Sequence, residues 1–374
     1  MSSKYLFIAI LILMLLLGCA SKGPLYAEGQ IAGEPVSAEM DSKIAKYSLA
    51  PDDDEPENIR KLRIDLQESS ATIPSTSELQ YLVDKGSIDF ATIILARALS
   101  SQENNRRWQA ESYALSKQLD SVGTKQRFIK SFENHHALLI PGWHWKTRRD
   151  TGADLKYQRR ALAAFGLQTT LVETNEHGDV EENALIIAQA INDSRKLNQS
   201  IVIISASKGG AETAYALGAY LEESQTAHVK GWLNIGGLIF GSTLVNYTAD
   251  DPKRWLRSIG FAEDTPVSVF DKLYPDIASS RLASLNFPSN LTVVNFVGLP
   301  FASTVGEQAK YGYSLLASIG PNDGTALIQE MLMPNGYTVV EVGLDHFMRS
   351  RRAMARALSL LLLITECQLD QKCK

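Results

Sequence analysis

Short apolar runs alternate with helix-like patterns through the second half of the chain. Runs such as Ala137–Ile140 and Ile201–Ile204 are wholly apolar, which is typical of strands buried on both faces of a sheet. Between them, apolar residues recur three and four positions apart, as on a helix with one buried side. This alternation predicts an α/β fold over residues 131–374: a mostly parallel central sheet with helices on both faces.

The individual elements follow from the same pattern. Strands are expected at 137–140, 167–172, 201–204, 229–235, 291–297 and 337–342. Helices are expected between them, and a closing helix over 351–364. Residues 247–288 interrupt the series as a largely polar insertion, a candidate lid or cap.

The chain before residue 131 has a different pattern. Residues 75–130 show helical periodicity, which predicts a helical N-terminal module. Residues 21–60 are polar and rich in Gly, Pro and acids, with no steady period. We therefore expect residues 19–74 to form a tether with some local structure.

The first residues form a signal-like segment. The apolar run Tyr5–Leu17 has thirteen residues, too few for a helix that spans the ~30 Å hydrocarbon layer but suited to the core of a secretion signal. The "LLGC" that ends at Cys19 resembles a bacterial lipobox. The resemblance implies removal of residues 1–18, acylation of Cys19 and a lipid anchor. Ala20 is not the aspartate of inner-membrane retention, which favours the outer membrane facing the periplasm. An ordinary signal peptide or a short signal anchor is the alternative.

Two further cysteines lie near the end of the chain. Cys367 and Cys373 form an even pair in a chain predicted to be exported, which favours a disulfide. Six residues along a continuous helix rise about 9 Å, more than a disulfide tolerates. The bridge therefore requires the last helix to end near Cys367. Two free thiols are the alternative.

Composition and charge exclude several classes of function. The chain has 374 residues, is 45% hydrophobic and carries a net charge of −5 without a long basic run. It therefore lacks the basic face that nucleic-acid binding needs. No metal or cofactor is implied, because the chain has no H-E-x-x-H, no Cys/His cluster and no phosphate-binding loop ending in Lys-Ser/Thr.

A serine stands between a predicted strand and a predicted helix. In the stretch "SIVIISASKGGAETAYAL", small residues flank Ser207 two positions before and two after, as a sharp strand-to-helix turn requires. The stretch resembles the nucleophile elbow of the α/β-hydrolase superfamily. Ser205 departs from that motif, which has glycine at its position. The resemblance extends over residues 135–365 and implies that Ser207 is a nucleophile.

Three more segments resemble the same superfamily. "HALLIPGWHW" resembles the oxyanion loop of lipases and esterases, which implies that the N–H groups of Trp143 and Lys208 hold a developing oxyanion; Pro141 replaces the usual histidine. "GPNDGT" resembles the turn of the triad acid, which implies Asp323, with Asp276 as the runner-up. "VGLDHF" places His346 after the last strand as the base. His228 is the other histidine after Ser207, but it precedes a strand at the opposite end of the sheet.

The resemblance implies a serine hydrolase of carboxylic esters, either lipase-like or esterase-like. Its partner would be an acyl ester, lipids included, together with the membrane through the N-terminal anchor. A thioesterase or amidase with the same triad is an alternative. A non-catalytic envelope protein on a hydrolase scaffold is another, because a fold does not establish an activity.

Overall fold

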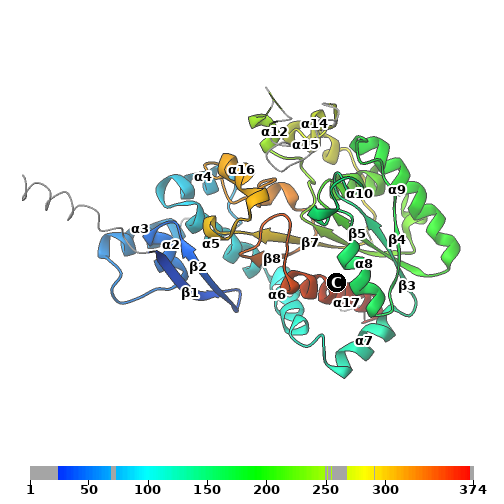
Figure 1. The fold of residues 1–374 in the computed structure, drawn as a ribbon, viewed down its shortest axis with the longest axis horizontal. Helices are drawn as coiled ribbons and strands as arrows, with labels where there is room; N and C mark the ends of the chain where they lie inside the picture. The colour runs from blue at the N-terminus through cyan, green and yellow to red at the C-terminus, as the bar shows by residue number, and fades with distance from the viewer. Residues whose placement is uncertain are drawn as a thin grey trace, which may run out of the picture.

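The computed structural model describes residues 24–68, 73–248, 251, 254, 268–289 and 291–370 (Figure 1). The elements before the sheet are β1 (Leu25–Ile31), β2 (Glu34–Met40), α2 (Lys43–Leu49), α3 (Glu57–Glu68), α4 (Thr76–Lys85), α5 (Ile88–Ser101), α6 (Glu103–Ser116) and α7 (Val122–Phe132). The rest are β3 (His135–Ile140), η1 (Arg149–Thr151), α8 (Lys156–Ala164), β4 (Gln168–Leu171), α9 (Val180–Ser194), η2 (Arg195–Leu197), β5 (Ser200–Ala206), α10 (Lys208–Ala219), α11 (Glu223–Thr226), β6 (Val229–Ile235), α12 (Leu244–Tyr247), α14 (Ser268–Asp271), α15 (Pro275–Ala283), β7 (Thr292–Leu299), η3 (Ala302–Thr304), α16 (Glu307–Leu316), η4 (Ile328–Met331), β8 (Tyr337–Val342) and α17 (Arg351–Asp370).

Six strands form one parallel sheet in the order β4-β3-β5-β6-β7-β8. Helices cover both of its faces, and Figure 1 shows α17 below the sheet and α9 and α10 above it. The predicted fold class is therefore confirmed. In parallel strands all carboxyl ends lie at one edge of the sheet, so the loops after β3, β5, β7 and β8 meet there.

Alternate residues of the central strands face different helices. Leu138 and Ile140 of β3 pack in the core that contains α9 and α10. Ala137 and Leu139 pack in the core that contains α17. Burial of both faces explains why these strands are apolar without interruption.

Side chains of α6 cover the outer edge of β8. The Gln109 amide accepts a hydrogen bond from Val340 N at 2.9 Å and donates one to Val340 O at 3.0 Å. Asn105 Oδ1 accepts one from Thr338 N at 2.7 Å. Three backbone groups of this edge strand are thus paired by side chains, which protects the edge against pairing with another strand.

The prediction of a tether over residues 19–74 is wrong for residues 25–68. These residues form an antiparallel hairpin, β1 and β2, followed by α2 and α3. In β1, residues 25, 27, 29 and 31 face inward and the residues between them face solvent, so Ala27 and Ile31 are buried. This period of two is diluted by small and polar residues, which made the segment resemble a linker.

The helices expected over residues 75–130 are present as α4, α5, α6 and α7. They do not form a separate module, because α5 and α6 both pack against β8: α5 contributes to the core on one face of β7 and β8, and α6 contributes to the core on the other face. Arg356 of α17 is fully buried and pairs with Glu34 of β2. The boundary predicted at residue 131 therefore does not divide two independent units.

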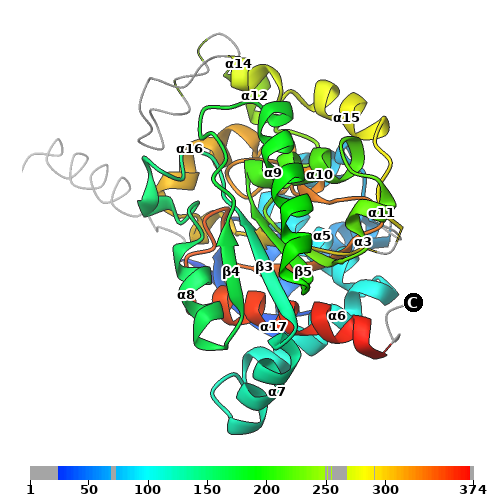
Figure 2. The same ribbon diagram turned by 90° about the vertical axis from the view of Figure 1, so that its right-hand side faces the viewer.

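The candidate lid is described only in part, since residues 249–250, 252–253 and 255–267 fall outside the described chain. Figure 2 shows α12, α14 and α15 at the opposite end of the molecule from α7.

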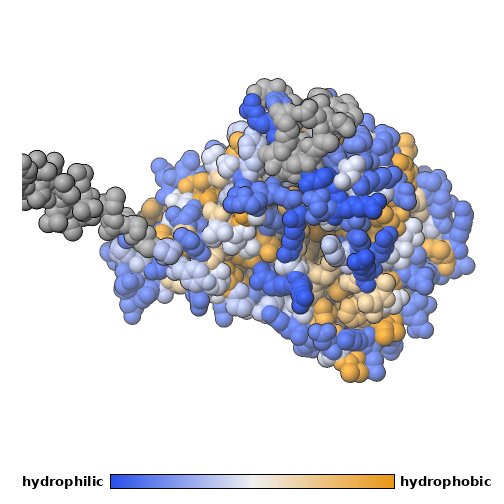
Figure 3. Space-filling view, in the orientation of Figure 1, coloured by the Kyte–Doolittle hydropathy of each residue, from blue (hydrophilic) through white to orange (hydrophobic). Residues whose placement is uncertain are grey.

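The surface of α7 carries exposed hydrophobic side chains, which Figure 3 shows at the end of the molecule where α7 lies; Val122 and Ile129 are among them. Within the described ranges, no helix has the length and apolar character needed to cross a membrane.

The predicted cysteine sites lie at the limits of the described chain. Cys367 is disulfide-bonded, and α17 continues three residues past it to Asp370. Cys373 and Cys19 lie outside the described residues. The pairing with Cys373 and the acylation of Cys19 stay predictions.

Candidate active site

Ser207 occupies a sharp turn between β5 and α10. Its backbone has φ 54° and ψ −127°, a left-handed region that non-glycine residues rarely adopt. The turn brings α10 close to the end of β3: a Cβ on Gly209 would lie 2.5 Å from the carbonyl oxygen of Pro141. Only glycine fits there, which explains the small residue two positions after the serine.

Ser205 has a structural role that its small size alone does not indicate. It is fully buried, and its Oγ accepts a hydrogen bond at 2.8 Å from the indole Nε1 of Trp232 on the neighbouring strand. Glycine, the residue of the usual motif, would leave that N–H without its acceptor. The departure from the motif is thus explained by a partner 27 residues away.

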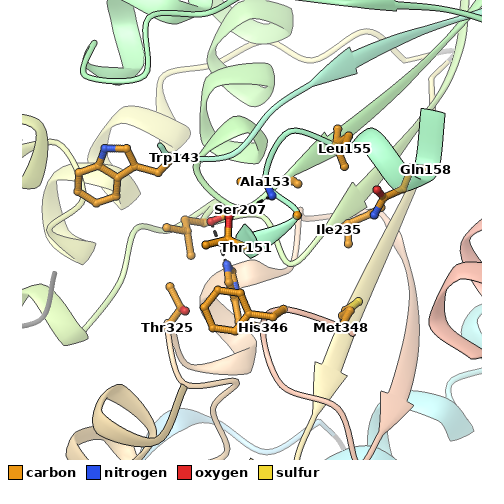
Figure 4. A pocket seen from close by; sticks show the side chains of 14 residues that line it. Trp143, Thr151, Ala153, Leu155, Gln158, Ser207, Ile235, Thr325, His346 and Met348 are labelled. Atoms are coloured by element: carbon orange, nitrogen blue, oxygen red, sulfur yellow. Dashed lines mark hydrogen bonds between the residues drawn. The ribbon is translucent and has the colours of Figure 1, made fainter. Parts of the chain in front are cut away.

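The structure brings Ser207, His346 and Asp323 into one hydrogen-bonded chain, of which Figure 4 shows Ser207 and His346. His346 Nε2 lies 2.9 Å from Ser207 Oγ, and His346 Nδ1 lies 2.5 Å from Asp323 Oδ2. Asp276, the runner-up, lies instead in the first turn of α15. His228 bonds to Ser194 and to a carbonyl of α9.

The Asp323 carboxylate is held by its own turn. It is 1% exposed, and its Oδ1 accepts hydrogen bonds from Thr325 N at 2.8 Å and Ala326 N at 3.0 Å. The backbone carbonyl oxygen of Asp323 accepts a hydrogen bond from His346 N at 2.9 Å. The two oxygens of the carboxylate therefore have fixed and different partners, so Oδ2 is directed at the imidazole.

Two carboxylates act on the charge of His346. Burial lowers the pKa of the imidazole, but the charge and hydrogen bond of Asp323 and the charge of Asp345 outweigh burial, so the net pKa lies above its ordinary value. The Asp345 carboxylate is not hydrogen-bonded to the imidazole; it accepts hydrogen bonds from Gly306 N and Phe347 N. Its effect on the pKa of His346 is that of its negative charge alone.

The two predicted oxyanion donors come from different parts of the fold, Trp143 from the loop after β3 and Lys208 from the start of α10. Lys208 is the first residue of α10, where N–H groups lack a carbonyl partner within the helix. Trp143 lies in the loop after β3, and its ring lies 5.1 Å from that of Phe270 on α14. That loop is fixed by a 2.9 Å hydrogen bond from Gly142 N to Ala153 O.

A pocket of about 90 Å³ opens at Ser207. Figure 4 shows Trp143 on one side of the serine, and Leu155, Ile235 and Met348 on the other. The lining is mostly apolar, with Ser207 and His346 at its centre. The volume corresponds to about three water molecules at the ~30 Å³ that each takes up in the liquid, which is room for a short acyl group. Among the described residues, no group of three or more His, Cys, Asp or Glu side chains is placed to hold a metal ion.

Three features of the site were missed at the level of sequence. They are the buried Lys208–Glu212 ion pair, the Ser205–Trp232 hydrogen bond and the influence of Asp345 on His346. The first had a visible signal, because Lys and Glu stand four residues apart directly after the elbow. The influence of Asp345 also had a signal, because Asp345 directly precedes His346. The Ser205–Trp232 hydrogen bond joins two neighbouring strands, and no local pattern encodes it.

Comparison with known proteins identifies the fold. No family model matches the chain, and no curated protein matches it. Among solved structures it is similar to a metagenomic carboxyl esterase, with a TM-score of 0.50 and 20% identity over 63% of this chain and 76% of the other. A mature lipase from Bacillus licheniformis has a TM-score of 0.46 and 16% identity over 63% of this chain and 90% of the other. A phospholipase from Legionella pneumophila has a TM-score of 0.40 and 16% identity over 53% and 45%. The chain has the α/β-hydrolase fold.

Proposed function

We propose that this protein is a serine hydrolase that cleaves carboxylic esters through an acyl-enzyme intermediate. One observation carries the proposal: Ser207, raised on the strained turn in an apolar pocket, is hydrogen-bonded to His346, which is hydrogen-bonded to the buried Asp323. This is the geometry of an activated nucleophile with an oriented base. The carboxyl esterase of the same fold supports an ester as the substrate.

The proposed reaction proceeds in two steps. As Ser207 Oγ bonds to the acyl carbon, His346 Nε2 takes its proton and then delivers it to the departing alcohol. Asp323 holds the tautomer in which Nδ1 carries hydrogen and stabilises the imidazolium. In the second step, His346 removes a proton from water as the water oxygen bonds to the acyl carbon. His346 then delivers that proton to Ser207 Oγ as the bond between Oγ and the acyl carbon breaks and the acid leaves.

The oxyanion formed in each step needs hydrogen-bond donors. We propose the N–H groups of Trp143 and Lys208, because Trp143 lines the pocket together with Ser207 and Lys208 follows Ser207 directly as the first residue of α10. Loss of one such donor typically costs about 10²–10³ in rate.

We also propose that the protein acts at the cell envelope. The apolar run and the cysteine that follows it support export and a lipid anchor on Cys19, with the outer membrane as its site. The first strand, β1, begins at Leu25, six residues after Cys19, so an anchor on Cys19 would hold the folded body near that membrane. Its ester substrates would then be periplasmic compounds or lipids.

The test is covalent labelling together with hydrolysis. The purified protein should react with a fluorophosphonate probe and hydrolyse p-nitrophenyl butyrate. Ser207→Ala should abolish both while keeping the melting temperature, because the change removes one hydroxyl at the pocket surface and no core contact. A wild-type protein that is folded, unlabelled and inactive on esters of every chain length would refute the proposal.

A further inference from the structure

A buried ion pair follows the serine directly. The side chains of Lys208 and Glu212, four residues apart on α10, are each 2% exposed and their charged ends pair. Lys208 Nζ also donates to the carbonyl oxygen of Gly178 at 2.8 Å. Removing two charges from water costs about as much as their attraction returns, so such a pair contributes little net stability. A role in positioning explains its presence better than stability does.

The pair is connected to the loop that follows β4. Glu212 Oε1 accepts a hydrogen bond at 2.7 Å from the Nδ2 of Asn183 on α9. The Asn183 amide also donates to Asn175 O at 2.9 Å and accepts from Asn175 N at 2.8 Å. Residues 175–178 are therefore held at both ends by this network, through Asn175 and through Gly178.

The same loop holds the segment that carries Trp143. Glu176 Oε2 accepts hydrogen bonds from Lys146 N at 3.0 Å and from Thr147 N at 3.1 Å. The indole N–H of Trp145 donates to Thr174 O at 3.1 Å. Residues 174–178 thus lie between the first turn of α10 and the loop after β3, and they contact both.

The backbone at Ser207 needs such support. Its left-handed conformation is strained, and strain of this kind persists only where surrounding contacts hold the chain in place. Lys208 shares a peptide bond with Ser207, and the N–H of that bond is the proposed oxyanion donor. An anchor on the Lys208 side chain restrains the rotation of this peptide group.

We infer that Lys208 and Glu212 are positioning residues. Their ion pair, together with the hydrogen bond from Lys208 Nζ to Gly178 O, fixes the Lys208 N–H in the orientation that the oxyanion requires and links it to the loop of Trp143. The inference rests on the proposed function. Neither side chain lines the pocket at Ser207, and both act through the backbone of the oxyanion donors. The pair should therefore affect the transition state more than substrate binding.

Three variants test it: Lys208→Met, Glu212→Gln and the two together. Lys208→Met leaves a buried carboxylate without its counter-charge, so it should lower stability as well as kcat. The double variant keeps both side-chain volumes and removes both charges, and its glutamine can still accept from Asn183. Its unfolding midpoint should return close to that of the wild type. Its kcat should remain about 10- to 100-fold below the wild-type value, with KM unchanged, because residue 208 is no longer anchored to Gly178.

A transition-state analogue separates positioning from folding. The inhibition constant of a short-chain trifluoromethyl ketone, whose bound form carries an oxyanion, should rise by the factor by which kcat/KM falls. The matched control is Arg63→Met with Glu55→Gln. These residues form a largely buried ion pair, and Arg63 lies on α3, far from α10 in Figure 1. The control should keep the wild-type kcat.

The outcomes are distinct. A stable double variant with low kcat, unchanged KM and weakened analogue binding supports the inference. A stable double variant with the wild-type kcat overturns it, and so does a control that loses as much activity at equal stability. A wild-type protein that hydrolyses no ester overturns the proposed function and this inference together. Wild-type activity with an unaffected double variant overturns the inference alone.

Discussion

Asp323→Asn should almost abolish activity because the turn around Asp323 dictates how an asparagine would sit. Oδ1 accepts hydrogen bonds from the backbone N–H groups of Thr325 and Ala326, so the amide oxygen must take that position. The amide NH₂ then faces His346 Nδ1, where Oδ2 lies at 2.5 Å in the native protein. An NH₂ can only donate there, so Nδ1 must be an acceptor.

The imidazole is thereby forced into the wrong tautomer. Its hydrogen moves to Nε2, which lies 2.9 Å from Ser207 Oγ and can no longer accept the serine proton. The loss of an oriented base of this kind costs about 10⁴ in kcat, or about 5 kcal/mol of transition-state stabilisation. KM should change little, because the substrate pocket is not altered.

The assay is hydrolysis of p-nitrophenyl butyrate, with active sites counted by fluorophosphonate titration in the wild type and folding checked by thermal unfolding. Asp276→Asn is the matched control, since Asp276 lies on α15 and should be replaceable within about twofold in rate. If a folded Asp323→Asn protein keeps a tenth of the wild-type rate, the tautomer argument is wrong. If Asp276→Asn does the damage instead, the acid has been misassigned.

Three further changes have defined outcomes. Because neighbouring carboxylates hold the pKa of His346 above its ordinary value, activity should rise with pH through a midpoint above ~6.5, and Asp345→Asn should lower that midpoint; a wild-type midpoint below ~6 contradicts this. Ser205→Gly should leave the Trp232 N–H without an acceptor and cost about 1–3 kcal/mol in urea unfolding while fluorophosphonate labelling persists; unchanged stability argues against that hydrogen bond. Cys19→Ser should shift the protein out of the membrane fraction in cells, and unchanged fractionation would exclude the anchor.

The sequence predicts the centre of the site because its determinants are local. A strand, a tight turn and a helix follow one another around Ser207, and each is legible in a window of a few residues. Asp323 and His346 follow later strands of the same sheet. Since parallel strands deliver their carboxyl ends to one edge, chain order alone brings these three residues to the same region.

Other features depend on contacts between distant segments. Lys208 and Glu212 have the spacing of an ordinary surface pair on a helix, and their burial results from the loop at Gly178 and from Asn183 on α9. Ser205 looks like an arbitrary small residue until Trp232 is placed on the adjacent strand. Burial and partner choice at such positions are set by packing, which the local pattern does not contain.

The N-terminal residues are a larger example of contacts that the local pattern does not contain. The pattern changes at residue 131, but residues before and after that position share one hydrophobic core. Gln109 pairs with both backbone groups of Val340 on the edge strand β8. Arg356, fully buried on α17, pairs with Glu34 of β2. A chain that starts at residue 131 would expose the edge strand and bury an arginine that has lost this carboxylate partner.

We therefore predict that residues 131–374 do not fold alone. Helix α5 inserts Phe90, Ile93 and Leu95, all fully buried, into the core that β7 and β8 share. Burial of each such side chain contributes about 1.5–3 kcal/mol, so these three alone supply about 5–9 kcal/mol, comparable with the whole stability of a typical domain. Residues 24–374 should be soluble, unfold cooperatively and react with the fluorophosphonate probe. Residues 131–374 should aggregate or lack a cooperative transition, and a soluble, labelled and active fragment would show that the N-terminal chain is dispensable.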